Sequence, residues 1–188
     1  MRKGLLLVLI TALLCPLAAS GAENTQYLAL TFAGCPAEGD TLRLLEGLES
    51  RGIRATFFLP PEDCSRSALL RDGGQELGIL CDADPERSRR EMAKEIRDIR
   101  DKLPQKARVR FVLHRGRDSV GFRQVAEALG LVIVQPELEM DRAAGGDILL
   151  LDARLPVEEL LYQIDRLQRR GFTLVSLSEL TRLRNMKF

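Results

Sequence analysis

The chain has 188 residues, of which 28 are lysine or arginine and 27 are aspartate or glutamate, so its formal net charge is +1. A balance this close to neutral argues against a nucleic-acid-binding surface and against a membrane-coating one. Tryptophan is absent and aromatic residues make up 5% of the chain, so few rings are available to stack on sugars.

Residues 1–22 have the layout of a secretory signal peptide. Arg2 and Lys3 precede an apolar run over residues 5–14, and small residues follow up to Ala22. Cleavage is expected after Ser20 or Ala22, which leaves a secreted or extracytoplasmic domain over residues 23–188. The apolar run is short for a membrane span, which needs about 20 residues.

Cys15 admits a lipoprotein as a minor alternative, although Leu14 and Pro16 beside it suit lipid attachment poorly. No second apolar run of membrane length follows, so no membrane span is expected in the mature chain.

A strand, a helix and a second strand form the unit around which the rest of the chain is arranged. Residues 27–36 are an apolar run that ends in a Gly-Cys-Pro turn, and residues 55–59 are β-branched and aromatic. Between them, residues 41–51 place leucines on one helical face. Such a unit packs as a right-handed crossover, with its chemistry at the carboxyl ends of parallel strands.

The same alternation continues to the end of the chain. Residues 60–72 predict a loop or short helix, and Pro85 is expected to open a charged helix that Pro104 stops. The predicted strands are 74–80, 108–113, 131–134 and 147–152, and the predicted helices are 86–102, 119–129 and 156–170, the last capped by Gly171. This alternation predicts an α/β barrel or an irregular relative of one.

The sequence also resembles a known family. Residues 30–36, Leu-Thr-Phe-Ala-Gly-Cys-Pro, are similar to the Leu-Thr-Phe-Asp-Asp-Gly-Pro signature of the NodB-homology polysaccharide deacetylases, carbohydrate esterase family four. Later motifs of that family are resembled, in the same order, by residues 55–58, 74–80 and 147–152. The resemblance implies its distorted (β/α) barrel, possibly incomplete, and a glycan as substrate class.

The family's chemistry uses a divalent metal, usually zinc, held by one Asp and two His. A second Asp acts as base on metal-bound water, and a late His acts as general acid. Carried onto this sequence, the metal-binding Asp falls on Gly34, and the two His ligands fall on Leu80 and Asp84. The catalytic base falls on Ala33, the Arg of the family motif falls on Val112, and the late His falls on Asp152.

These replacements predict that the family's metal site is lost, so that no cofactor is expected. Alanine, glycine and leucine side chains offer no lone pair, so at most Asp84 could remain as a ligand. A shift of the alignment cannot rescue the site, because His114 is the single histidine of the chain.

A rebuilt site is the alternative. Cys35, Cys64 and Cys81 each follow a predicted strand, so parallel packing is expected to gather them at one rim. A site built from Cys35, Cys81, Asp84, His114 and Asp152 could hold zinc. We favour a disulfide instead, with Cys35–Cys64 or Cys64–Cys81 as first choices, because no Cys-x-x-Cys pair is present.

Other constellations have simpler explanations. Ser119 lies near His114 and Asp118, but Asp118 or Ser119 is better explained as a helix cap than as part of a triad. Asp82 and Asp84 suit a helix start. Arg115 and Arg117 could hold an anionic sugar, although solvated surface arginines are the commoner case.

Three functions follow from the sequence. The first is an exported pseudoenzyme that binds cell-wall glycan or an envelope protein. The second is a divergent carbohydrate deacetylase with a rebuilt site. The third is a structural or regulatory envelope protein with a filled cleft, which Leu80 and Leu113 would plug.

Overall fold

The structure is a computed structural model, and it describes residues 26–82, 87–104, 107–116, 119–137 and 139–185. The predicted signal peptide, Cys15, Asp84, Arg117 and Asp118 lie outside the described residues.

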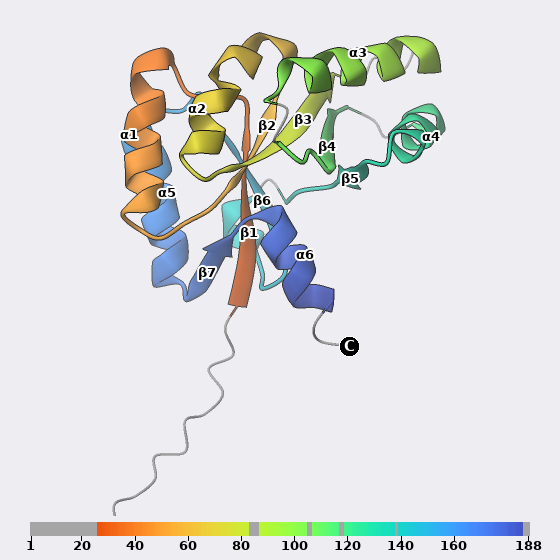
Figure 1. The fold of residues 1–188 in the computed structure, drawn as a ribbon. Coiled ribbons are helices and arrows are strands. Elements are labelled where there is room, and N and C mark those ends of the chain that lie inside the picture. The colour runs from red at the N-terminus through yellow and green to blue at the C-terminus, as the bar shows by residue number, and fades with distance from the viewer. Residues whose placement is uncertain (1–25, 83–86, 105–106, 117–118, 138, 186–188) are drawn as a thin grey trace, which may run out of the picture.

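One parallel sheet of seven strands forms the centre of the fold (Figure 1). Its order is β5-β4-β3-β2-β1-β6, and β7 also pairs with β1. The strands are β1 (Gln26–Ala33), β2 (Thr56–Leu59), β3 (Glu76–Asp82), β4 (Phe111–Arg115), β5 (Val132–Val134), β6 (Ile148–Asp152) and β7 (Phe172–Val175).

Strand β1 has three neighbours because two of them share one of its edges. β6 pairs with residues 29–33 of β1, whereas β7 pairs with residues 26–29 and β2 with residues 31–33. β6 overlaps both of the others, so β2 and β7 lie one after the other along the opposite edge. The predicted first strand is therefore confirmed, and it pairs with three other strands.

The sheet curls into an incomplete barrel. Past β5, Glu137 forms a single parallel bridge with Leu149 of β6, with the Glu137 N–H donating to the Ile148 carbonyl at 2.7 Å. This one bridge links the two ends of the sheet in place of a full ladder. The prediction of a distorted, possibly incomplete (β/α) barrel is confirmed.

The helices and two 3₁₀ turns connect the strands. They are α1 (Glu38–Glu49), η1 (Pro61–Arg66), α2 (Ser67–Asp72), α3 (Arg89–Lys102), α4 (Val120–Ala128), η2 (Met140–Arg142), α5 (Val157–Arg169) and α6 (Leu177–Asn185). Helix α6 lies apart from the others, beside β1 in the lower part of Figure 1.

Strand alternation divides the core into two layers. The larger hydrophobic cluster packs against the helices, and we call it the outer core. From β3 it includes Leu77, Ile79 and Cys81. Leu80 joins a smaller cluster on the concave side, which we call the inner core. Leu177 of α6 belongs to the inner core, so this helix covers the concave side of the sheet.

Two predicted boundaries are corrected. Helix α3 begins at Arg89 rather than after Pro85, because Ser88 caps it and forms a capping box with Glu91. Strand β4 begins at Phe111 rather than at residue 108 and continues through Arg115. Ser119 caps α4, as predicted, by accepting a hydrogen bond from the Phe122 N–H at 3.1 Å.

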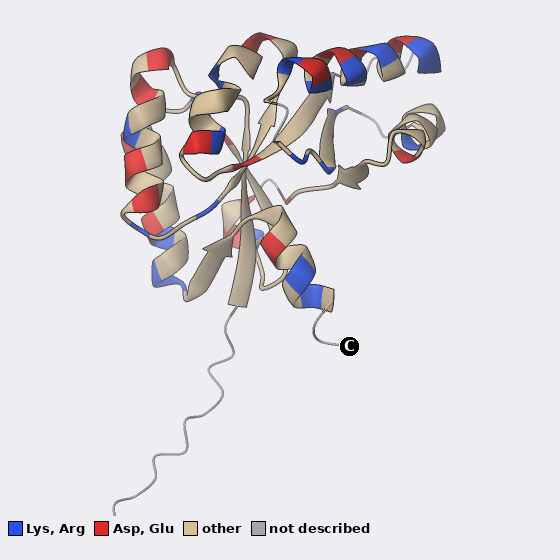
Figure 2. Cartoon of the chain, viewed as in Figure 1, with Lys and Arg blue, Asp and Glu red and all other residues tan. Residues whose placement is uncertain are grey.

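Charged side chains gather on the helices and turns, while the strands are almost free of them (Figure 2). Within the described part of the chain, no helix has both the length and the apolar character needed to cross a membrane.

Candidate functional site

The carboxyl ends of β1 and β6 form the rim where the resemblance places the family's chemistry. Ala33 pairs with Asp152 across the two strands, and the Ala153 N–H donates to the Ala33 carbonyl at 3.0 Å. Asp152 is exposed, and its carboxylate accepts a hydrogen bond from the Arg154 N–H at 3.0 Å. The positions onto which the base and the general acid fall are therefore adjacent, but the Asp152 carboxylate caps its own turn.

Apolar side chains fill the concave side beneath this rim. Leu80 is 1% exposed and Leu113 is 4% exposed, and both pack in the inner core with Phe58. A Cβ on Gly78 would lie 2.6 Å from the Phe58 ring, so this glycine allows Phe58 to lie flat over β3. The position assigned to the first histidine ligand is thus part of a packed core.

Gly34 stands beside an ion-paired carboxylate that the sequence did not indicate. Gly34 has φ of +81°, and a Cβ there would lie 3.1 Å from Asp63 Oδ2 and 3.6 Å from Arg154 Nε. The space beside the assigned metal-ligand position is therefore bordered by η1 and by the turn after β6.

Asp63 is held by three groups. It is 3% exposed, its Oδ2 accepts a hydrogen bond from the Cys35 N–H at 3.0 Å, and its Oδ1 pairs with Arg66. Arg154 Nη2 lies 3.8 Å from Oδ2 and 3.4 Å from Glu62 Oε1. A carboxylate paired in this way stabilises the loop and offers no oxygen for a metal without losing these partners.

The three described cysteines are buried thiols, so the predicted disulfide is not formed. All of them lie in the outer core instead of at the barrel mouth, because their side chains point toward the helix layer. Cys64 donates to the Pro60 carbonyl at 3.4 Å, and the Cys35 sulfur lies 3.8 Å from the Thr41 hydroxyl. Burial raises the pKa of both the Cys35 and the Cys64 thiols.

Among the described members of the proposed rebuilt site, Cys81 and His114 are neighbours on adjacent strands, whereas Asp152 belongs to β6. Cys81 and His114 are register partners on β3 and β4, but the His114 ring packs against Phe122 of α4, with centroids 4.1 Å apart. Asp152 lies at the exposed rim instead. In the described ranges, no group of three His, Cys, Asp or Glu residues is placed to hold a metal.

Val112, where the motif's Arg falls, is fully buried in the outer core. Arg115 ends β4 and is exposed.

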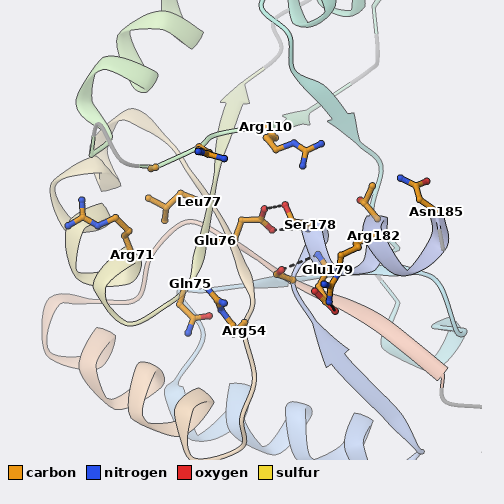
Figure 3. A pocket seen from close by; sticks show the side chains of 14 residues that line it. Arg54, Arg71, Gln75, Glu76, Leu77, Arg110, Ser178, Glu179, Arg182 and Asn185 are labelled. Carbon is orange, nitrogen blue, oxygen red and sulfur yellow. Dashed lines mark hydrogen bonds and ion pairs between the residues drawn. The ribbon is translucent and has the colours of Figure 1, made fainter.

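A cavity of about 720 Å³ lies at the opposite end of the strands, and we call it the basal pocket (Figure 3). It is bordered by the segments that lead into β2, β3 and β4 and by α6. Five arginines line it: Arg54, Arg71, Arg108, Arg110 and Arg182. Its carboxylates are Glu76 and Glu179.

Glu76 links β3 to α6 at the centre of this pocket (Figure 3). Its carboxylate accepts hydrogen bonds from the Thr56 hydroxyl at 2.7 Å, from the Ser178 N–H at 3.1 Å and from the Ser178 hydroxyl. The Thr56 hydroxyl in turn accepts from the Leu177 N–H at 3.0 Å. These bonds satisfy the first N–H groups of α6 and fix the helix to the concave side of the sheet.

Neither of these polar features was predicted from the sequence. The spacing of Asp63 and Arg66, three residues apart in a short helix, could have suggested an ion pair. The basic and apolar alternation over residues 108–113 could have suggested that its arginines share one side. Nothing in the sequence places Arg154 or α6 beside them.

No family model matches the sequence, and a comparison with curated proteins also gave no match. Solved structures do match. The peptidoglycan deacetylase PdaC from Bacillus subtilis has a TM-score of 0.75 at 20% identity, over 87% of this chain and 94% of that one. The Xyl-CE4 domain of a multidomain xylanase from the hindgut metagenome of Trinervitermes trinervoides has a TM-score of 0.73 at 22% identity, over 86% and 92%.

A third match is BA3943 from Bacillus anthracis, described as a CE4 family pseudoenzyme. Its TM-score is 0.68 at 22% identity, over 84% of this chain and 66% of that one. The chain thus spans about two thirds of the length of BA3943 and nearly all of PdaC. These likenesses agree with the resemblance seen in the sequence and show that the chain has the fold of the CE4 polysaccharide deacetylases.

Proposed function

We propose that this protein is an exported, non-catalytic relative of the deacetylases whose fold it has, with a binding or structural role in the cell envelope. The observation that carries the proposal is the packed inner core, in which Leu80 and Leu113 lie beneath the rim. The signal-peptide pattern of residues 1–22 supports the export.

Hydrolysis by metal-bound water needs a cation with open coordination positions next to the substrate carbonyl. At the rim, Gly34 provides no ligand, and the nearby Asp63 is engaged by arginines. His114, the single histidine, packs against α4. These placements support loss of the deacetylase reaction.

The filled concave side also bears on what the protein binds. A glycan chain held at the rim would need an open groove and rings to stack on, and Leu80 and Leu113 close the floor beneath it. A ligand or an envelope protein is therefore better accommodated elsewhere on the molecule. The description of BA3943 as a pseudoenzyme gives a precedent for this fold without activity.

The test combines metal analysis with an acetate-release assay. The purified protein is incubated with zinc, dialysed and analysed by elemental mass spectrometry, and acetate release from acetylated chitooligosaccharides is measured with PdaC as the positive control. We expect less than one zinc per chain and no acetate above a heat-inactivated sample.

One zinc per chain together with released acetate would overturn the proposal. In that case Cys81→Ala and Asp84→Ala would show whether the rebuilt site is responsible, since both variants should lose the zinc. Export is tested separately by sequencing the amino terminus of the secreted protein, which should begin at Gly21 or Glu23.

A further inference from the structure

We propose that the basal pocket binds a phosphate-bearing ligand through Arg108 and Arg110. The inference rests on the proposed binding role and gives that role a site and a ligand class. It does not depend on the loss of hydrolysis, because the pocket lies at the opposite end of the strands from the rim.

The backbone places these two arginines on one side. Between them, Val109 packs against the outer core. Residues 108–110 lead into β4, and both Arg108 and Arg110 line the pocket. Both residues are exposed, which leaves their guanidinium groups accessible to a ligand from solvent.

The pocket's own carboxylates are already engaged by other groups. Glu76 accepts hydrogen bonds from Thr56 and Ser178, and Glu179 pairs with Arg182 at 2.6 Å. Arg71 pairs with Asp72, also at 2.6 Å. Among the described residues, none of these ion pairs includes Arg108 or Arg110, so the pocket carries positive charge that an anion can neutralise.

The chemistry of the lining favours phosphate. A guanidinium group presents a planar fork of N–H donors, a geometry that matches the oxygens of a phosphate group. The hydroxyls of Ser176 and Thr181 and the amide of Asn185 add neutral hydrogen-bonding groups. The described lining contains no aromatic ring, which argues against recognition of a nucleobase by stacking.

The volume agrees with this assignment. About 720 Å³ lies within the usual range for small-molecule sites, roughly 300–1,000 Å³. A phosphorylated sugar would therefore fit, as would the phosphate of a lipid headgroup presented at the pocket mouth.

The experiment is isothermal titration calorimetry of the purified protein at low salt with inorganic phosphate, glucose 6-phosphate and glucose. A parallel arm measures co-sedimentation with vesicles of phosphatidylglycerol and with vesicles of phosphatidylcholine. The test variant is Arg108→Gln/Arg110→Gln. The matched control is Arg90→Gln/Arg97→Gln, which removes the same charge from the exposed side of α3.

We expect glucose 6-phosphate to bind and glucose not to bind, with affinity falling by about tenfold or more in the test variant. The control should bind as the unmodified protein does, and added salt should weaken binding in both. Binding by phosphatidylglycerol vesicles alone, lost in the test variant, would also support the proposal and would identify a headgroup as the source of phosphate.

The proposal is overturned if no phosphate compound or anionic vesicle binds, or if the test variant and the control lose affinity equally. Failure of the phosphate site can be told apart from failure of the proposed function, because different measurements test them. The acetate-release assay reports on the rim, whereas the titration reports on the basal pocket.

Discussion

Gly34 is the residue at which the chain leaves β1 with a positive φ of +81°. An L side chain at this conformation is strained, and its Cβ would lie 3.1 Å from Asp63 Oδ2. We expect Gly34→Ala to lower the free energy of unfolding by about 1–2 kcal/mol, measured by urea denaturation. The same substitution at Gly39 in α1 is the control, because its Cβ would meet nothing within 4 Å.

Gly39→Ala should leave stability unchanged or raise it by less than about 1 kcal/mol, since alanine is the better helix former. Equal losses in the two variants would contradict the assignment of strain to the turn after β1.

The buried thiols predict how stability depends on pH. Burial raises the pKa values of Cys35 and Cys64 in the folded state, so the unfolded chain releases these protons at a lower pH than the folded one. Their contribution to stability is therefore complete below the ordinary cysteine pKa, about 8.5, and declines as the pH rises above it. Urea denaturation at a series of pH values measures this decline.

The double variant Cys35→Ala/Cys64→Ala should have a flatter stability profile above that pH. An identical decline in this variant would show that other groups cause it.

At the scale of single residues, counting residue types is the most direct argument that the sequence offers. One histidine in the whole chain is enough to exclude two histidine ligands. Asp63 and Arg154 were missed because they meet only through tertiary packing, between η1 and the turn after β6. The three described cysteines are free thiols that all belong to the outer core, and strand order alone does not give the side of the sheet that they face.

Helix α6 depends on Glu76 for its attachment to the sheet. The charged carboxylate accepts hydrogen bonds from Thr56 and from two groups of Ser178. Hydrogen bonds to a charged group contribute about 1.5–3 kcal/mol, so Glu76→Gln should lower the free energy of unfolding by that amount. Faster amide exchange in α6 is expected as well, because the helix also covers the inner core.

Glu179→Gln is the control for this change. It removes the same charge from the same helix, but the pair with Arg182 is largely exposed and contributes less than about 1 kcal/mol. If both variants behaved alike, Glu76 would not be the attachment of α6.

At the scale of elements, the local patterns were sufficient for most helices and strands. The apolar runs predicted β1 and β2, and Ser119 and Gly171 were correctly placed at helix ends. The start of α3 was wrong because the Ser88 capping box competes with the proline signal. The position of α6 could not be predicted, since its buried face is complementary to the concave side of a sheet built from distant strands.

The pairing of the strands predicts that backbone amides are protected from hydrogen exchange to different degrees in different strands. β1 is paired along both edges, whereas β5 has three residues and pairs with β4 alone among the strands. Amides of β1 should exchange only through global unfolding, and those of β5 through local opening at lower free energy. Hydrogen-exchange mass spectrometry checks this order, and equal protection of the two strands would contradict it.

The fold of the molecule was predictable because alternation and the family resemblance pointed to the same barrel. The sequence predicted only that the barrel could be incomplete, not where its closure fails. The single bridge at Glu137 depends on how far the sheet curls, and that curl is set by packing on both of its sides.

The arrangement around β1 also constrains when the protein can fold. β1 comes first among the described elements, but its partners β6 and β7 are near the end of the chain. The ladder of this apolar strand can therefore be completed only when nearly the whole polypeptide is available, and for an exported chain that means after translocation. A chain that ends before Phe172 should accordingly fail to reach the native state, which circular dichroism and hydrogen exchange would detect.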